Sequence, residues 1–402
     1  MTLSDVDRAD VVYNPFRHEV QDDPYDIYRL MRDEAPNYYD VEHGFYALSR
    51  YDDVLAAYQD NATYSNSHGI TLEPVASGVP GILTCLDDPE HAAYRRLVFK
   101  VFTPRSVRDL EPYARQRAAE ILEPAREGGE LDGVDEYSAI LPLSTICQLL
   151  GIPQDESELL REVADRSLSR GDGETDMNAD AIAAMIALQT QLLDLMALRR
   201  KKPADDLISG MAAITEVEVV GKTIPVPPEE TANRLMELSL AGYDTLARTV
   251  GNGLLALYRH PDQRRELVED VSLIPNTFEE VMRWEAAFQF SGRWTTRDVE
   301  LHGSVIPAER RVLLLIGSAN RDERVWDDPE KFDIHRQIDR QIGFGSGVHL
   351  CTGTHLARMQ GRVMLEELLS RFPNYEIAED RLVRSYSTNF RGYQHVPLIL
   401  NP

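Results

Sequence analysis

Apolar residues recur every three or four positions along most of this chain, a spacing that predicts helices as its main element. Such patterns, several opened by a proline or closed by a basic residue, predict helices over 23–34, 54–59, 104–126, 156–169, 179–200, 228–259 and 353–371. Shorter runs with strand character cover 44–49, 299–301, 311–316 and 396–400. We therefore predict a mainly α protein with small β-sheets.

The pattern gives no point at which to divide the chain. A length of 402 residues would allow two or three domains of about 150 residues. However, no linker rich in proline, glycine or serine interrupts the sequence, so we expect a single domain over residues 1–402. The polar, glycine-bearing segment 171–176 predicts either a mobile loop or a plain surface connector between two helices.

Composition narrows the class of protein. Hydrophobic residues make up 43% and charged residues 27%, a balance that can bury a sizeable core. The three cysteines, Cys85, Cys147 and Cys351, show no pairing pattern and are fewer than the four of an all-cysteine zinc or iron–sulfur site. The N-terminus is polar, and we find no stretch that approaches the roughly 20 apolar residues of a membrane span. We expect a soluble, cytoplasmic protein without such a span.

Charge argues against nucleic acid as a partner. Lys and Arg number 42 against 67 Asp and Glu, a net charge of −25 that would repel phosphates. One basic-rich segment, from Arg95 to Arg117, runs against this trend. It is either a solvated helix face or a surface for an acidic partner.

The segment 344–353, Phe-Gly-Ser-Gly-Val-His-Leu-Cys-Thr-Gly, is the most informative about chemistry. Its glycines, at 345, 347 and 353, can adopt positive φ angles and let backbone approach a flat cofactor. A helical pattern begins at Thr354, so Cys351 would lie near a helix N-terminus, which favours a thiolate. The run predicts a sulfur offered to a metal; the alternative is a glycine-rich turn with a buried free cysteine.

Two other motifs become more informative when they are considered together with Cys351. Glu280 and Arg283 share a helix face and can form a bidentate ion pair, although such pairs are frequent on surfaces. Ala241-Gly242-Tyr243-Asp244-Thr245 lies in the middle of the predicted 228–259 helix, where glycine is unfavourable and a threonine hydroxyl can bond a carbonyl one turn back. This predicts a locally opened helix, or else a glycine packing contact beside a solvated aspartate.

Together these three motifs resemble the cytochromes P450, and the resemblance covers essentially the whole chain. It implies the cytochrome P450 fold and haem b (iron protoporphyrin IX) with the Cys351 thiolate as axial ligand. Residues expected around the haem are Phe344, Gly345 and Gly353 on the cysteine side, Ala241 and Gly242 on the opposite, distal side, and His91, Arg95, Arg293 and His349 at its propionates.

The resemblance also assigns roles away from the haem edge. Glu280, Arg283 and Arg336 would form an ion-pair network for folding and haem retention, and Asp244 and Thr245 would deliver protons on the distal side. One departure is Glu285-Ala286-Ala287, where many members carry prolines, which puts the path of residues 288–290 in doubt. Another is the polar set Thr352, Thr354 and His355 around the cysteine helix.

The implied activity is a monooxygenase that inserts one atom of O2 into a lipophilic small organic molecule. No Gly-x-Gly-x-x-Gly turn for a dinucleotide is present, so a separate ferredoxin or flavodoxin with its NAD(P)H reductase should supply electrons. We expect it to dock on Arg96, Lys100, Arg105, Arg108 and Arg358. Alternatives are a peroxide-driven haem-thiolate enzyme and a non-catalytic haem protein.

The substrate pocket is expected to be apolar and aromatic. By position in the family fold, its candidate residues are Ile70, Leu72, Val79, Ile82, Leu83, Leu238, Phe288, Phe290 and Phe390. The same residues could instead be ordinary core.

Overall fold

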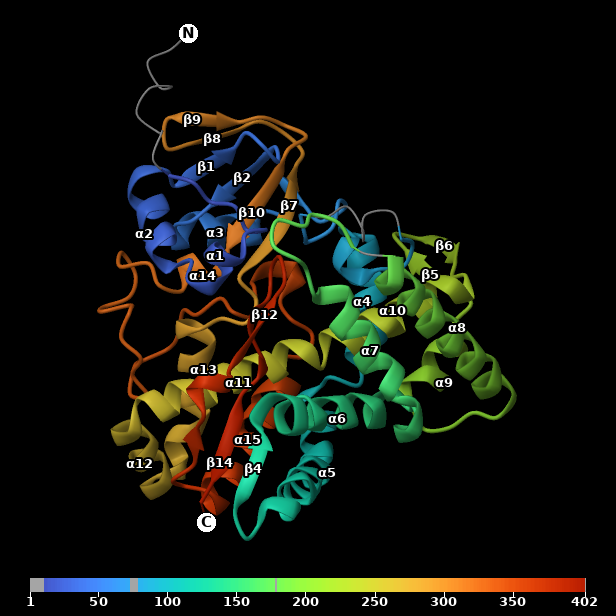
Figure 1. Ribbon diagram of the computed structural model, residues 1–402. Helices are drawn as coiled ribbons and strands as arrows, with labels where there is room; N and C mark the ends of the chain where they lie inside the picture. Colours follow the sequence, from blue (N-terminus) through green and yellow to red (C-terminus); the bar gives the residue numbers. More distant parts are fainter. Residues whose placement is uncertain (1–10, 73–78, 178, 402) are drawn as a thin grey trace.

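The computed structural model describes residues 11–72, 79–177 and 179–401. Its α-helices are α1 (His18–Asp22), α2 (Tyr25–Glu34), α3 (Tyr51–Gln59), α4 (Glu90–Phe99), α5 (Pro104–Leu122), α6 (Ile140–Leu150), α7 (Glu158–Leu168), α8 (Ala179–Lys201), α9 (Leu207–Ala212), α10 (Pro228–Ala241), α11 (Asp244–Arg259), α12 (Pro261–Glu269), α13 (Ile274–Trp284), α14 (Ile316–Ala319) and α15 (Thr354–Arg371). The mainly α class is confirmed (Figure 1).

The strands form small sheets, as expected. They are β1 (Asn37–Asp40), β2 (Phe45–Leu48), β3 (Tyr64–Ser65), β4 (Gly129–Asp132), β5 (Glu216–Val219), β6 (Lys222–Pro225), β7 (Phe290–Thr295), β8 (Val299–Leu301), β9 (Ser304–Ile306), β10 (Arg311–Leu315), β11 (Glu376–Ile377), β12 (Val383–Tyr386), β13 (Arg391–His395) and β14 (Pro397–Leu400). The largest sheet has the order β1-β2-β10-β7-β3, with β2 and β10 parallel. It lies at one end of the molecule beside α1, α2, α3 and α14 (Figure 1).

Strand β10 shows why this sheet forms where it does. Its sequence, Arg-Val-Leu-Leu-Leu, is apolar after the first residue, and Val312 to Leu315 are fully buried. A continuous apolar run is typical of a strand that is covered on both faces. Val312 and Leu314 pack into one apolar cluster and Leu313 and Leu315 into another, so β10 joins two parts of the core.

Helix α11 crosses the middle of the molecule (Figure 1) and is buried along most of its length. The sequence pattern predicts one helix over 228–259, but the structure has two, α10 and α11, separated at Gly242 and Tyr243. Thr245 Oγ1 donates to the carbonyl of Ala241 at 3.1 Å, the competing bond that such a break needs. Ile146 packs closely against Gly242, where an added Cβ would lie 2.9 Å from Ile146 Cδ1.

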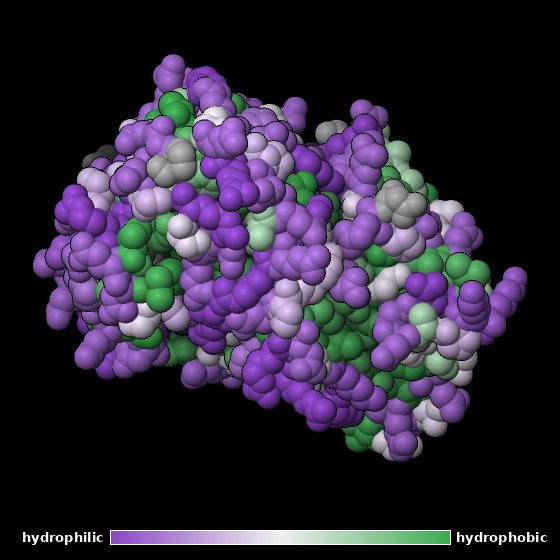
Figure 2. All heavy atoms as spheres, turned by 90° about the horizontal axis from the view of Figure 1, so that it is seen from below, coloured by the Kyte–Doolittle hydropathy of each residue, from purple (hydrophilic) through white to green (hydrophobic). Residues whose placement is uncertain are grey.

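Helix α8 corrects one expectation. From the sequence we expect no stretch long and apolar enough to span a membrane. By length and composition alone, α8 meets that requirement among the described residues. In the structure its buried residues, among them Ala184, Leu188 and Leu192, form the side that packs against α7 and α10. The face of the molecule seen in Figure 2 is largely hydrophilic, with hydrophobic residues in separate patches.

Candidate haem-binding site

The cysteine loop is shaped by two glycines and one backbone bond. Gly345 and Gly347 both have φ of 70°, and a Cβ on Gly347 would lie 2.3 Å from the carbonyl oxygen of Tyr58. The expected positive φ is wrong for Gly353, whose φ is −85°. The amide of Cys351 donates to the carbonyl of Phe344 at 3.0 Å, which closes the loop just before α15. The loop therefore presents Cys351 in a fixed place beside α3.

The Cys351 side chain is exposed by area, although many protein atoms surround its sulfur. Burial raises the pKa of the Cys351 thiol, against hydrogen bonds from the amide of Gly353 and the hydroxyl of Thr354 and against the charges of Arg95 and Arg358. The helix start and these cations alone therefore do not give the persistent thiolate that the sequence suggests. A bound metal cation is the partner that would deprotonate this sulfur.

Four nitrogen-bearing side chains gather on one side of this loop. Arg95 from α4 donates to the carbonyl of Leu350 at 2.5 Å, and the rings of His91 and His349 lie 3.9 Å apart. Arg293 from β7 is 3% exposed; it donates to Ser291 Oγ and to the carbonyl of Gly292. Burial lowers the pKa of Arg293, and burial together with the neighbouring cations lowers that of His349 to about 2.

Three of these four side chains, Arg95, Arg293 and His349, have no acidic partner among the residues that the structure describes. The exception is His91, whose Nδ1 lies 3.4 Å from Asp88 Oδ1. No ion pair reaches Arg95 or Arg293, and the buried Nε2 of His349 has no hydrogen-bond partner. Asp87, the acid whose charge acts on Arg293, instead accepts from the amide of Asn66 at 2.9 Å and from Ser65. Buried guanidinium groups normally pair with carboxylates. This donor set fits a ligand with carboxylate groups, such as haem with its two propionates.

The residues of the distal motif, 241–245, do not all have the same surroundings. Ala241 is exposed and ends α10, and Thr245 is partly exposed one turn later. Asp244, by contrast, is buried in a bidentate ion pair with Arg248, with 2.6 Å from Arg248 Nε to Asp244 Oδ2 and 3.0 Å from Nη2 to Oδ1. Acid and alcohol are thus adjacent in sequence but not bonded to each other. Proton transfer between them requires Asp244 to leave Arg248 or a water to join them.

Glu280, Arg283 and Arg336 come together in one cluster. Arg283 donates to both oxygens of Glu280, at 2.7 and 2.8 Å, and both side chains are fully buried. Arg336 Nε reaches Glu280 Oε1 at 3.3 Å. Arg283 also donates to the carbonyls of Asn320, Pro329 and Lys331, so the pair anchors the irregular segment that precedes the cysteine loop.

The expected pocket residues are placed in different surroundings. Phe288 and Phe390 contact each other with ring centroids 5.3 Å apart. Ile70, Ile82 and Leu238 are partly buried, and Val79 is 37% exposed. Phe290 is fully buried in the cluster that contains Tyr13 and Phe45, and Leu72 packs against the same cluster. Leu83 is also in the core, at 6% exposed.

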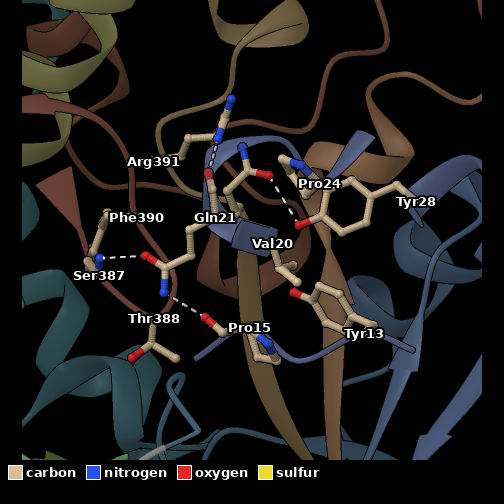
Figure 3. Close-up of a pocket in the computed structure, with 11 residues that line it drawn as sticks. Tyr13, Pro15, Val20, Gln21, Pro24, Tyr28, Ser387, Thr388, Phe390 and Arg391 are labelled. Carbon is tan, nitrogen blue, oxygen red and sulfur yellow. Dashed lines mark hydrogen bonds between the residues drawn. The ribbon is translucent and has the colours of Figure 1, made fainter. Parts of the chain in front are cut away.

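Figure 3 shows a small cavity between the N-terminal segment and the turn from β12 to β13. Its volume of about 20 Å³ suits a single water molecule and not an organic substrate. Gln21 bridges its walls, donating to the carbonyl of Pro15 and accepting from the amide of Ser387. Phe390 lines this cavity as well.

The departure at Glu285 has a structural explanation. Glu285 accepts from Arg391 and from Arg321, whose guanidinium also stacks on Tyr25 at 3.4 Å. The cluster ties the end of α13 to α2 and to β13, after which Phe288 forms an isolated bridge with Phe390. These charged contacts therefore fix the path of residues 285–290, which proline residues direct in many family members.

Reasoning from sequence missed three residues at the site. Arg248 lies one turn after Asp244, a spacing that itself predicts an ion pair. Tyr58 lies under Arg293, with 5.0 Å from the guanidinium carbon to the ring centroid, and Glu237 holds the backbone of Leu83 and Thr84. The last two depend on contacts between distant parts of the chain, which no local pattern reveals.

Known proteins give the same answer as this geometry. The family model described as cytochrome P450 matches residues 179–389. Cytochrome P450 123 of Mycobacterium tuberculosis is 38% identical over 97% of both chains. Cytochrome P450 130 of the same species is 36% identical, covering 94% of this chain and 95% of its own. A mutant of P450 EryK in complex with erythromycin B has a TM-score of 0.86 and 33% identity, covering 96% of this chain and 98% of its own.

A cysteine loop beside buried nitrogen donors fits the class of haem-thiolate proteins. The chain belongs to the cytochrome P450 family. It has the cytochrome P450 fold and is an oxidoreductase, a monooxygenase that binds haem through a cysteine thiolate.

Proposed function

We propose that this protein is a single-domain, cytoplasmic monooxygenase that oxidises a lipophilic small molecule with electrons from a separate ferredoxin or flavodoxin. The observation that carries the proposal is the site itself: Cys351 lies beside Arg95, whose charge acts on the sulfur, and Arg293 and His349 complete a donor set without acidic partners among the described residues. Haem bound there supplies O2 activation, and thiolate donation favours O–O cleavage.

The residues around the haem have separate tasks. Cys351 holds the iron, while Phe344, Gly345 and Gly353 shape its loop. His91, Arg95, Arg293 and His349 bind the propionates. Glu280, Arg283 and Arg336 keep the segment before the loop folded, because removing one charge from a buried cluster strands its partner.

On the distal side the chain must deliver protons without admitting bulk water. Ala241 and Gly242 leave room at the opened turn, and the Thr245 hydroxyl can hold a water there by giving up its bond to Ala241. Asp244 can pass a proton to that water once it leaves Arg248. These residues favour O2-driven chemistry over a peroxide-driven reaction, which would not need a proton supply.

The proposed substrate is apolar because the candidate pocket residues are. Phe288 and Phe390 form one aromatic wall, Leu238 lies on α10, and Ile82 lies on the segment packed against that helix. The neighbour P450 EryK binds erythromycin B in its mutant complex, which supports a pocket that accepts an organic ligand in this fold.

The proposed donor surface is cationic. Arg96, Lys100, Arg105 and Arg108 are all exposed, and none forms an ion pair among the described residues. Arg358 differs from the prediction, because Glu279 accepts from it at 2.6 and 3.0 Å and offsets its charge. Arg108 and Arg358 also border a groove of about 310 Å³ between α5, α13 and α15. An acidic ferredoxin or flavodoxin suits this face.

A turnover assay separates the candidate activities. The purified protein is incubated with a panel of lipophilic compounds that shift its haem spectrum, either with NADH, ferredoxin reductase and ferredoxin, or with hydrogen peroxide. The proposal predicts oxygenated product with the electron-transfer system at a rate well above that with peroxide. Product from peroxide alone would establish the alternative, and no product in either arm would leave a haem protein without this activity.

A further inference from the structure

Three turns of α10 hold the chain segment 80–84 against the helix. An added Cβ on Gly81, which has φ of 90°, would lie 2.5 Å from the carbonyl oxygen of Glu230, so the two backbones touch. One turn on, Asn233 Nδ2 donates to the carbonyl of Pro80 at 2.8 Å. Contacts at 230, 233 and 237 share one face of the helix. That face leads on to Ala241 at the opened turn.

Glu237 makes the strongest of these contacts. Its Oε2 accepts from the amide of Leu83 at 2.6 Å, and its Oε1 accepts from the amide and hydroxyl of Thr84 at 2.9 and 2.6 Å. From the other side, Asn66 Nδ2 donates to the carbonyl of Thr84 at 2.9 Å. The turn at residues 83–85 is therefore clamped between α10 and the chain beside β3.

Burying the charged form of Glu237 is by itself unfavourable for folding. Burial raises the pKa of Glu237, in spite of the hydrogen bonds from residues 83 and 84 and the charge of Arg234. A carboxyl whose pKa is raised by folding makes the folded protein less stable as the pH rises through the range in which that carboxyl ionises. Since three donors converge on it, the carboxylate gives geometric definition to the turn and not net stability.

We propose that Glu237 is a positioning residue for substrate selectivity, which fixes residues 80–84 as a rigid wall of the pocket. The inference rests on the proposed function. Ile82 and Leu83 are on the clamped segment, and Leu238 and Ala241 follow Glu237 on α10, so one carboxylate sets the spacing between two walls. With the clamp released, the pocket should lose its discrimination by ligand size.

The test compares Glu237→Gln, Glu237→Ala and Asn233→Ala with Glu229→Gln, a control at an exposed acid on the same helix. Imidazole and the bulky triaryl azole clotrimazole serve as haem-ligating probes, and their dissociation constants are read from the spectral shift. Loss of the hydrogen bonds to Glu237 is expected to change the ratio of the two constants about tenfold in Glu237→Ala and less in Glu237→Gln, whose amide oxygen can still accept. Glu229→Gln should keep the wild-type ratio.

Amide hydrogen exchange gives a readout that does not depend on haem. The amides of Leu83 and Thr84 should exchange faster in Glu237→Ala and at the wild-type rate in Glu229→Gln. An unchanged ratio or unchanged exchange in both Glu237 variants, with the haem spectrum intact, would overturn this inference alone. Absence of a thiolate-type haem spectrum in the wild-type protein would overturn the proposed function and this inference with it.

Discussion

The surroundings of Arg293 differ from those of another buried arginine in this protein, Arg321. It is a buried guanidinium with a lowered pKa and no ion pair among the described residues. Arg321 is nearly as buried but has Glu285 and Glu330 as partners. This difference is the one that we expect between a guanidinium that binds a ligand and one that supports the fold.

This difference predicts opposite effects of the same substitution. Arg293→Leu should leave the haem-free protein as stable as the wild type within about 1 kcal/mol, because the lost charge was unpaired. It should weaken haem affinity at least tenfold, or about 1.4 kcal/mol. Arg321→Leu should lower the free energy of unfolding by about 3–5 kcal/mol. Urea unfolding and haem titration measure both; a strongly destabilised haem-free Arg293→Leu protein would contradict the assignment.

Thr245 can be tested with less disturbance than its neighbour. Its hydroxyl makes one bond, to Ala241, so Thr245→Ala should cost under about 1 kcal/mol of stability and keep haem and substrate binding. Proton delivery should suffer, and more of the NADH consumed should appear as hydrogen peroxide. Asp244→Asn is a poorer probe, since it strands Arg248 in a buried site at about 3–5 kcal/mol. Product formation still tightly coupled to NADH in Thr245→Ala would contradict the role.

At the scale of elements, the opened turn between α10 and α11 depends on close packing at Gly242. Its φ of −78° is open to any residue, so the constraint is steric. A Cβ there would lie 2.9 Å from Ile146 Cδ1 and 3.0 Å from the carbonyl oxygen of Leu238. Any side chain at this position must therefore displace Ile146 or shift the backbone at the end of α10.

We expect Gly242→Ala to destabilise the protein by about 1–3 kcal/mol through overpacking, although alanine favours helix. Gly210→Ala is the matched control, because Gly210 lies within α9 with nothing within 4 Å of an added Cβ. That substitution should stabilise by about 0.5–1 kcal/mol. Thermal unfolding measures both, and a Gly242→Ala protein that melts above the wild type would show that the turn is not held by packing.

Elements with strong periodicity could be predicted from the sequence. Helices α2, α5, α8 and α15 begin and end within a few residues of the predicted bounds, and β8 is predicted to the residue. The break at Gly242 could be foreseen as a weak point but not as two helices, because the packing of Ile146 decides it. Phe290 was expected either at the pocket or in the core and is buried in the core, since strand alternation alone does not say which face of β7 meets a ligand.

The candidate site divides in the same way. The ion pair between Glu280 and Arg283 could be predicted from their spacing in the sequence. The loop around Cys351 could be predicted from its glycines. The Glu237 contacts join residues more than 150 positions apart, and the partners of Arg321 come from separate elements. The sequence pattern cannot foresee contacts of this kind, because they depend on the tertiary arrangement.

At the scale of the whole molecule, a net charge of −25 surrounds a local cationic face. Arg96, Lys100, Arg105 and Arg108 stand out against an acidic background, so an acidic donor should be attracted to this face in particular. Association driven by charge weakens as salt screens it, over roughly 8 Å at physiological ionic strength.

We expect the double variant Arg105→Glu and Arg108→Glu to raise the KM for ferredoxin and to flatten the dependence of the rate on salt. Arg265→Glu, a reversal at an exposed residue on α12, is the control and should leave both unchanged. Stopped-flow reduction at several salt concentrations measures the effect. Reduction rates that ignore both salt and the double substitution would place the donor elsewhere.

Ligation of haem iron by the Cys351 thiolate underlies every role assigned above. The most direct measurement is the absorption spectrum of the reduced, carbon monoxide-bound protein, for the wild type and for Cys351→His, with Cys85→Ser and Cys147→Ser as controls. We predict the strongly red-shifted Soret band of thiolate ligation in the wild type and both controls, and its loss in Cys351→His. An unshifted band in the wild type, or a red-shifted band that survives in Cys351→His, would contradict it.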